Sequence, residues 1–369
     1  MTLLSNQSPS RHSSSSIKND NMDIYEFAEL KRLSVRQIFD FTSDVNPIGP
    51  SNKAKNAIRR SIKLLEYPPD KRIRYLRRYI CKREMIGEDR IVFGHGSSSL
   101  MYHLLMAIKP KDILLISPVS RRYRDILDGL GINIHLLHSE EEDRFRFTID
   151  INGIINRLEH VDMVMLPNPH DVTGATLTPE DVTALIDATE KDEKMLVIDE
   201  SYIDFTTRTS FIKPSSETEH TIVVRTFSNF YALKGLPIGY AVGSCETVRR
   251  LTENMCALQL NTLAYAAAMA SLKDKGFKKR TIDFIENEKA YIIKKLKCVN
   301  DLQIIDTPCN FLLLKTSRDV SDIKNIFLRY NIFVDEYKSI SGGGYLRLPI
   351  NRHKKNAKFV KTLNYIFKA

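Results

Sequence analysis

Short apolar runs alternate with helical patterns through the middle of the chain. Asp112–Ser117 (DILLIS) is almost entirely apolar, which is typical of a strand buried on both faces of a sheet. Thr178-Pro179-Glu180 combines an N-cap residue, a proline at the first helical position and an early acid, so it predicts a helix start. The predicted strands are Arg90–Phe93, Asp112–Ser117, Asn133–His138, Asp162–Leu166, Met195–Ile198, Thr221–Arg225 and Ile238–Val242. Strands separated by helices indicate an α/β fold whose mostly parallel sheet has helices on both faces.

The two ends of the chain differ from this middle. Met22–Phe41 has a helical spacing of apolar residues and ends in the polar turn FTSDVNPIGPS. After Cys245 the pattern is helical, and the final part reads strand–helix–strand–strand–helix. We therefore predict a large domain with a mostly parallel seven-stranded sheet and a small α+β domain. The predicted parts are a disordered Ser-rich tail (1–21), an N-terminal segment packing with the small domain (22–50), the large domain (51–245), connecting helices (246–295) and the small domain (296–369).

Composition excludes several classes of protein. The five cysteines form no CxxC pair, so neither a disulfide framework nor a metal site is expected, and reduced thiols in the cytoplasm are the default. No apolar run approaches the roughly 18 residues that cross a bilayer, so no membrane partner is expected. Much of the +10 net charge falls in Arg59–Arg83. This region is either a nucleic-acid patch or a solvated helical face that attracts small anions, and the absence of a nucleic-acid motif favours the second reading.

Polar residues that follow the predicted strands are the candidates for ligand binding, because open parallel sheets bind ligands at the carboxyl ends of their strands. In GHGSSSL the glycines and hydroxyls before a helix could cradle a phosphate, although a serine-capped helix start explains them equally well. Asp199 ends an apolar strand and needs either a protonated ring nitrogen or a structural arginine or amide as partner. Arg347 lies inside an apolar strand and could bind a carboxylate or form a structural salt bridge.

Seven segments, in this order, carry a family resemblance. They are DIYEFAELKRLSVRQIFDFTSDVNPIGPS, YPPD, FGHGSSSL, PNPHDVTGATLTPED, VIDESYIDF, RTFSNFYALKGLPIGYAVG and GYLRLPI. Together they resemble the fold-type I pyridoxal-phosphate (PLP) enzymes of the class I/II aminotransferase family. Within it, the chain is similar to threonine-phosphate decarboxylases and histidinol-phosphate aminotransferases.

The resemblance implies a role for each matching residue. It implies a phosphate site at Ser97, Ser98 and Ser228, a ring-nitrogen partner at Asp199, and a hydrogen bond from Tyr202 to the phenolic oxygen. It further implies that Tyr67 reaches the partner subunit's cofactor in a homodimer. Asn46 and Arg347 would hold a substrate carboxylate.

The departures from the family pattern fall on the same site. Asn229 stands where the family has its Schiff-base lysine, and asparagine cannot form an imine. Lys234 is the candidate substitute, so the candidate catalytic residues are Asn229, Lys234 and Tyr202. Asp171 places a carboxylate where it should repel the cofactor's phenolate oxygen. Three further departures, in the stacking residue, the phosphate arginine and a small-domain arginine, are Ser120, Pro237 and Asp335.

These departures make PLP a doubtful cofactor on sequence grounds and leave three functions open. The first is a diverged aminotransferase-fold protein whose cleft takes an anionic, amino-acid-like ligand. The second is an active aminotransferase or decarboxylase, a transferase or lyase that acts on a phosphorylated amino acid. The third is a pseudoenzyme that serves as a dimeric partner or regulator. No nucleic-acid partner is expected.

Overall fold

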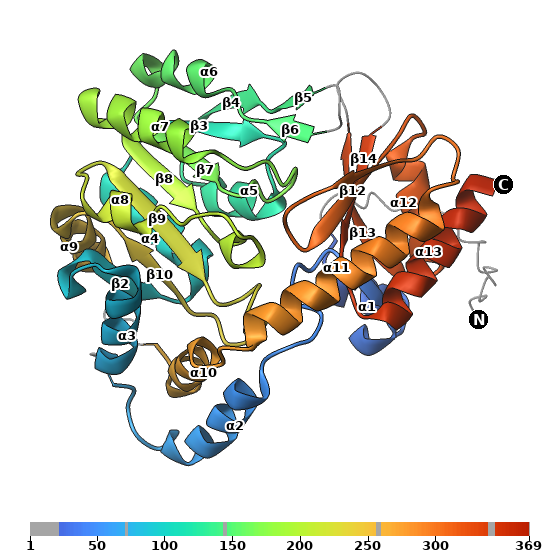
Figure 1. Cartoon of the computed structure of the whole chain (residues 1–369), viewed down its shortest axis with the longest axis horizontal. Helices are drawn as coiled ribbons and strands as arrows, with labels where there is room; N and C mark the ends of the chain where they lie inside the picture. Colours follow the sequence, from blue (N-terminus) through green and yellow to red (C-terminus); the bar gives the residue numbers. More distant parts are fainter. Residues whose placement is uncertain (1–21, 71–72, 143–145, 256–259, 339–343, 369) are drawn as a thin grey trace, which may run out of the picture.

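Two β-sheets organise the protein (Figure 1). The computed structural model describes residues 22–70, 73–142, 146–255, 260–338 and 344–368. The tail expected at 1–21 lies outside the described residues. Within the described part, no helix is long and apolar enough to cross a membrane.

The larger sheet has seven strands in the order β2-β10-β9-β8-β7-β3-β4. Its strands are β2 (Ile91–Gly94), β3 (Asp112–Ser117), β4 (Asn133–His138), β7 (Met163–Pro167), β8 (Met195–Asp199), β9 (Thr221–Thr226) and β10 (Gly239–Val242). Strand β10 runs antiparallel to both of its neighbours, and the other pairings are parallel. The predicted α/β fold with a mostly parallel seven-stranded sheet is therefore confirmed.

Alternate residues of the central strands point to opposite faces of the sheet and belong to two different hydrophobic cores. On β3, Leu114 joins the cluster that contains Leu185, whereas Leu115 joins the cluster that contains Leu104. Helices therefore cover both faces of the sheet, as expected for strands that are apolar throughout. The helices of this part are α2 (Asn52–Ser61), α3 (Arg74–Glu84), α4 (Gly96–Ile108), α5 (Arg121–Leu127), α6 (Ile151–Ile155), α7 (Pro179–Lys191), α8 (Ile212–Ser216), α9 (Cys245–Asn254) and α10 (Thr262–Leu272). Strands β5 (Glu140–Glu142) and β6 (Arg146–Thr148) pair with each other as an antiparallel two-stranded ribbon.

The second sheet has five strands in the order β1-β13-β14-β12-β11. They are β1 (Phe39–Phe41), β11 (Gln303–Asp306), β12 (Phe311–Thr316), β13 (Ile332–Lys338) and β14 (Gly344–Pro349). Three helices accompany them: α11 (Phe277–Leu296), α12 (Val320–Arg329) and α13 (His353–Lys368). Figure 1 shows the long α11 running from the region of the larger sheet to the second sheet.

The N-terminal segment joins the second sheet, because β1 pairs in parallel with β13. The helical pattern expected over Met22–Phe41 is only partly realised. Helix α1 (Ile24–Leu30) ends early, Arg32 has a φ of 52°, and Phe39–Phe41 is a strand. Phe39–Phe41 form a strand instead of a helix because their backbone pairs with β13. A tertiary contact thus overrides the local helical pattern. The boundaries given above for the five parts of the chain stay predictions.

Candidate functional site

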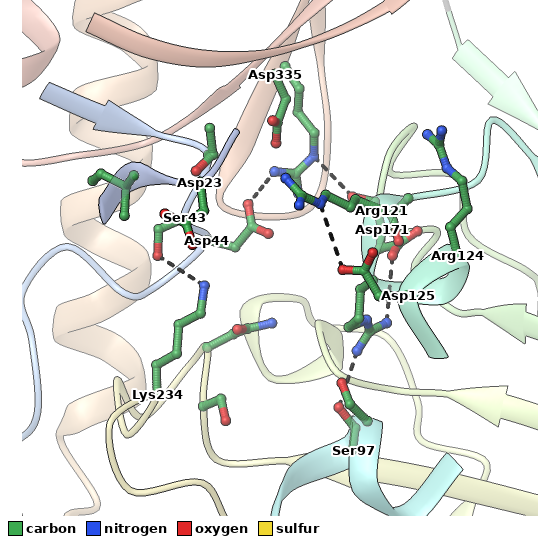
Figure 2. A pocket seen from close by; sticks show the side chains of 18 of the residues that line it. Asp23, Ser43, Asp44, Ser97, Arg121, Arg124, Asp125, Asp171, Lys234 and Asp335 are labelled. Carbon is green, nitrogen blue, oxygen red and sulfur yellow. Dashed lines mark hydrogen bonds and ion pairs between the residues drawn. The ribbon is translucent and has the colours of Figure 1, made fainter. Parts of the chain in front are cut away.

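A cleft of about 1550 Å³ lies where residues from both sheets and from the N-terminal segment meet (Figure 2). Its wall includes Ser97 and Ser98 at the start of α4, the arginines of α5, and Asp171 in the loop after β7. Strands β13 and β14 add Asp335 and Arg347 to the opposite side. The carboxyl ends of the parallel strands therefore open into this cleft, as expected for an open α/β sheet.

The predicted phosphate site is at the start of α4. Ser97 is buried and Ser98 is half-buried, and both lie in the first turn of this 13-residue helix, whose free N–H groups favour anions. The site approaches β10 closely, because a Cβ on Gly239 would lie 3.0 Å from the Gly96 carbonyl carbon. Ser228 lines the same cleft, and its Oγ accepts a hydrogen bond from Thr226 Oγ1 at 3.0 Å. The structure thus brings together the three serines that the sequence predicted.

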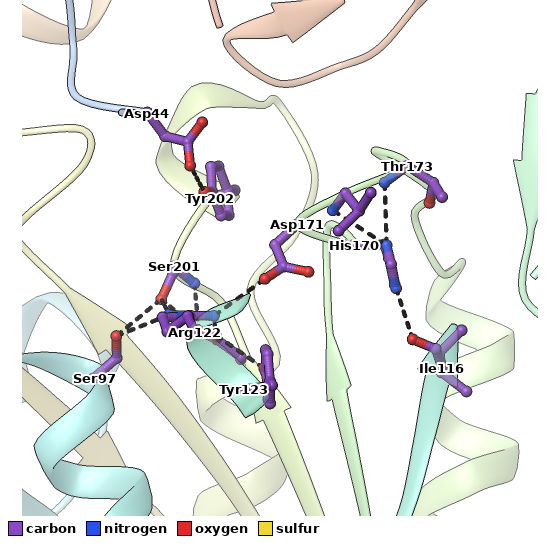
Figure 3. Close-up of polar contacts among 12 residues, drawn as sticks. Asp44, Ser97, Ile116, Arg122, Tyr123, His170, Asp171, Thr173, Ser201 and Tyr202 are labelled. Carbon is purple, nitrogen blue, oxygen red and sulfur yellow. Dashed lines mark hydrogen bonds and ion pairs between the residues drawn. The ribbon is translucent and has the colours of Figure 1, made fainter. Parts of the chain in front are cut away.

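Asp199 ends β8, and its side chain is 1% exposed. It meets the cleft through its partner Arg122, which lines it. Its carboxylate accepts hydrogen bonds from the Arg122 guanidinium, from the Tyr123 hydroxyl at 3.1 Å and from the Ser201 backbone N–H at 2.9 Å (Figure 3). A buried carboxylate requires such partners. Of the two partners considered for Asp199, the structure shows the structural arginine.

Arg122 is the residue at this site that the sequence reading missed. Its guanidinium also lies 3.6 Å from Asp171 and donates to Ser97 Oγ at 3.1 Å and Ser201 Oγ at 3.3 Å. Burial alone would lower the pKa of Arg122, but the Asp199 carboxylate together with Tyr123, Asp171 and Tyr202 outweighs that effect, and the net pKa is raised. The available signal was the basic run RRYR directly after a strand and a proline turn.

Asp171 is buried beside Arg122 because the loop that carries it is held in place by His170. The His170 Nδ1 accepts hydrogen bonds from the backbone N–H groups of Val172 and Thr173, at 3.3 and 3.1 Å. Its Nε2 therefore carries the proton and donates to the Ile116 carbonyl at 3.2 Å. Burial lowers the pKa of His170, which keeps this ring neutral and the loop fixed.

Tyr202 and Arg347 share one acidic partner, Asp44, from the N-terminal segment. The Tyr202 hydroxyl donates to Asp44 Oδ2 at 2.5 Å, and Arg347 Nη1 donates to Asp44 Oδ1 (Figures 2 and 3). Arg347 Nε donates to the Asp171 carbonyl at 3.0 Å. Burial raises the pKa of Tyr202, and Asp44 raises it further. Asp44 was also missed from sequence, although it stands two residues before the candidate Asn46.

Three predicted residues are not among those that line the cleft: Asp199, which is paired with Arg122, and Asn46 and Tyr67. Asn46 is buried, and its Nδ2 donates to the Phe230 carbonyl and to Thr281 Oγ1, both at 2.8 Å. It therefore ties the N-terminal segment to the loop after β9, and a role toward substrate stays a prediction. Tyr67 is 61% exposed, and its predicted contact with a partner subunit likewise stays a prediction.

Asn229 and Lys234 lie on the wall of the cleft. The Asn229 carbonyl accepts from the Asn46 backbone N–H at 2.9 Å. Lys234 is exposed, and its Nζ donates to Ser43 Oγ at 3.4 Å, so its ammonium reaches across to the N-terminal segment (Figure 2). Between the two residues the chain turns through Ala232, whose φ is 56°.

The residues of the cleft fit most of PLP. The start of α4 with its serines suits a phosphate, and the buried Asp199 suits a protonated ring nitrogen once Arg122 moves away. Among the described residues, three buried polar atoms at the cleft, Ser120 Oγ, Glu336 Oε2 and Arg347 Nη2, have no hydrogen-bond partner. Such atoms point to a polar ligand. Asn229 offers no amine for a covalent bond to the cofactor's aldehyde.

Comparison with known proteins gives relatives over nearly the whole chain. The sequence model of the family "Aminotransferase class I and II" matches residues 37–358. A histidinol-phosphate aminotransferase of Methanosphaera stadtmanae is 23% identical over 351 residues, which cover 92% of this chain and 94% of that protein. A threonine-phosphate decarboxylase of Salmonella typhimurium is 25% identical over 351 residues, which cover 93% of this chain and 95% of that protein.

Solved structures share the fold. The histidinol-phosphate aminotransferase of Sinorhizobium meliloti, in complex with pyridoxal-5'-phosphate, superposes with a TM-score of 0.85 at 19% identity. That match covers 97% of this chain and 99% of that one. The L-threonine-O-3-phosphate decarboxylase of Porphyromonas gingivalis gives a TM-score of 0.75 at 20% identity, over 89% of this chain and 99% of that one.

These findings correct one expectation. The sequence reading made PLP a doubtful cofactor because the lysine, the stacking residue and the phosphate arginine are replaced. That reading is wrong: a fold neighbour that matches almost the whole chain carries PLP, and the serines at the start of α4 are in place here. The reading gave too much weight to single replaced contacts, while the phosphate site rests on backbone geometry that those replacements leave intact. With a family model that matches residues 37–358, the chain belongs to the class I and II aminotransferase family.

Proposed function

We propose that this protein binds PLP in the cleft without a covalent bond to the chain, and that it has diverged from ordinary aminotransferase turnover. The observation that carries the proposal is Asn229. It lies on the cleft wall beside Ser228, where relatives of this family would present a lysine. An amide nitrogen is not nucleophilic and takes up no proton near neutral pH, so Asn229 can neither form the imine nor move a proton at a substrate carbon.

Other residues of the chain keep recognisable roles in this proposal. PLP, when bound, supplies an electron-withdrawing ring to an amine ligand. Ser97, Ser98 and Ser228 hold the phosphate, and Asp199 holds the proton on the ring nitrogen after Arg122 has moved. The Tyr202 hydroxyl donates to Asp44, so in this proposal it positions Asp44, and its role toward the phenolic oxygen stays a prediction.

The ligand that we propose is a phosphorylated amine or amino acid. Arg121 and Arg124 from α5 and Lys234 from the loop after β9 line the same cleft and favour an anionic group. The relatives named above act on phosphate-bearing amines, according to their names. A second candidate is an active aminotransferase or decarboxylase in which Lys234 supplies the amine. The observation in its favour is that Lys234 is exposed on the same wall.

A lysine restored at position 229 tests the proposal. PLP affinity is measured by equilibrium dialysis for wild type, Asn229→Lys and Lys234→Ala, and each loaded protein is then reduced with borohydride. We expect wild type to bind PLP and to yield no covalent adduct by mass spectrometry, whereas Asn229→Lys gains an adduct at residue 229. A wild-type adduct that disappears in Lys234→Ala supports the second candidate instead. Failure of wild type to bind PLP sinks both.

We further propose that the chain forms a homodimer through the surface around α2 and α3. Apolar side chains gather there in exposed positions: Ile62 (53%), Leu65 (58%), Tyr67 (61%) and Tyr75 (68%). Exposed apolar surface of this kind marks interaction sites. Light scattering after gel filtration should give twice the chain mass for wild type and a smaller mass for Leu65→Glu. A monomeric wild type contradicts the proposal.

A further inference from the structure

One nitrogen of the Arg347 guanidinium has no partner in the protein and is left for a ligand. Its Nε donates to the Asp171 carbonyl at 3.0 Å, and its Nη1 donates to Asp44. Its guanidinium carbon lies 3.8 Å from the centre of the Phe311 ring, which fixes the plane of the group. Within the described part of the chain Nη2 has no partner, although the side chain is 3% exposed and lines the cleft. A buried unpaired donor of this kind calls for an acceptor on a ligand.

Asp44 is held firmly in its position. Its second carboxylate oxygen accepts from the Tyr202 hydroxyl at 2.5 Å. Its backbone carbonyl accepts from Asn310 Nδ2 at 2.8 Å. Two residues later, Asn46 fixes the same segment to Phe230 and Thr281. Rotation of the Asp44 side chain away from Arg347 would therefore also break its hydrogen bond from Tyr202.

A ligand carboxylate is poorly accommodated beside this arrangement. Arginine binds a carboxylate most strongly through two parallel N–H donors on neighbouring nitrogens. Nη2 is free, but both of its neighbours are engaged, because Nε donates to the Asp171 carbonyl and Nη1 donates to Asp44. Three acidic side chains already surround the guanidinium: Asp44 is paired with it, Asp171 lies in the neighbouring loop, and Asp335 stands opposite it in the β13–β14 register. A further carboxylate would meet these acids and would be repelled by them, least by Asp171, which is paired with Arg122. A neutral acceptor such as a hydroxyl needs one donor and meets no repulsion.

We propose that Asp44 occupies the place of a substrate carboxylate, so that the cleft selects phosphorylated amines that lack an α-carboxylate. The negative field of the three acids favours the ligand's ammonium group, while the arginines of α5 favour its phosphate. Asp44 is then a specificity-determining residue, and Arg347 Nη2 takes a neutral acceptor. This inference rests on the proposed function and deepens it, because it names the class of ligand.

Two probes that differ only in the carboxylate test the inference: O-phosphoethanolamine and O-phospho-L-serine. The full-length protein is first saturated with 4-deoxypyridoxine 5'-phosphate, a cofactor analogue without the aldehyde, so that the probes cannot react with free cofactor. Calorimetric titration of wild type should show phosphoethanolamine binding at least tenfold more tightly. In Asp44→Asn, which keeps the side-chain size and removes the charge, we expect phosphoserine to gain at least tenfold relative to phosphoethanolamine.

Asp125→Asn is the matched control. Asp125 is an acid of the same cleft that lies 3.7 Å from Arg121, whereas the acid paired with Arg347 is Asp44, so this variant should keep the wild-type preference. Equal affinities in wild type, an unchanged preference in Asp44→Asn, or no binding of either probe overturns the inference while the proposed function stands. If the cofactor analogue itself does not bind, the proposed function fails and the inference fails with it.

Discussion

Two ion pairs occupy opposite sides of the cleft, and they differ in how firmly they are held. At the floor, the buried acid Asp199 is paired with Arg122. At the wall, the buried base Arg347 is paired with Asp44. Asp199 ends a strand, and Arg122 supplies the positive charge that the resemblance assigns to the cofactor's ring nitrogen. Arg347 lies within a strand, and Asp44 supplies the negative charge that the resemblance assigns to a substrate carboxylate. The protein thus satisfies with its own side chains the two charges that a cofactor ring and a substrate would otherwise meet.

The partners differ in their anchoring. Asp44 is fixed by Tyr202 and by the Asn310 contact to its backbone. Arg122 stands near the start of the seven-residue helix α5, and its side chain is 27% exposed. Asp199 also keeps two other donors, Tyr123 and Ser201, when Arg122 moves. In our proposal the floor pair opens to admit the cofactor, which also breaks the Arg122 contacts to Asp171, Ser97 and Ser201, whereas the wall pair stays closed.

The largest expected effect comes from breaking the wall pair. Asp44→Ala leaves the Arg347 guanidinium buried without its main partner. Loss of one member of a buried pair costs about 3–5 kcal/mol, and we expect about 3 kcal/mol here because Asp335 remains nearby. Urea denaturation of wild type and Asp44→Ala measures the difference in the free energy of unfolding. A loss no larger than that of the exposed control Asp125→Ala would show that the wall pair is not structural.

Opening the floor pair should give a smaller effect, and on binding rather than on folding. Arg122→Ala leaves Asp199 with hydrogen-bond donors but without a cation, so a protonated ring nitrogen becomes the better partner. We expect PLP affinity by equilibrium dialysis to rise about tenfold, or about 1.4 kcal/mol. Arg249→Ala on α9, where Arg249 is paired with Glu246 and is not among the residues that line the cleft, should leave the affinity unchanged. Weaker binding in Arg122→Ala would instead assign Arg122 to the phosphate, in place of the arginine replaced by Pro237.

The fold was predictable because its signals are local and repeated. Runs such as Asp112–Ser117 are buried strands wherever they fall, and Thr178-Pro179-Glu180 forms the expected capped helix start. The position of Asp199 at a strand end placed it at the cleft for the same reason. Ser97 and Ser98 follow a strand directly, so they too are placed by chain topology.

The partners of these residues could not be read in the same way. Asp44 meets Arg347 across 303 residues of sequence, and Arg122 meets Asp199 across 77. Pairing at such separations depends on the packing of a loop or a short helix, and neither leaves a periodic pattern. The alternatives left open for Asp199 and Arg347 did include a structural ion pair. Sequence could name that option but not the residue that fulfils it.

The smallest expected effect concerns the excess of acid at the wall. Burial raises the pKa of Asp335 to about 6; Arg347 opposes this and Asp44 adds to it. The folded protein therefore binds this proton more tightly than the unfolded chain, in which aspartate has its ordinary pKa of about 3.9. The resulting stabilisation is complete below about pH 4 and is lost as pH rises through about 6. Because the side chain is partly exposed, we expect about 1 kcal/mol in total.

Urea denaturation at constant ionic strength from pH 4 to pH 7 should show wild type losing this amount relative to Asp335→Asn. In an Asp44→Ala background the step should shrink, because the neighbouring charge that raises the pKa is gone. Parallel pH profiles for wild type and Asp335→Asn would mean that Asp335 is ionised throughout, and that Arg347 compensates both acids at once.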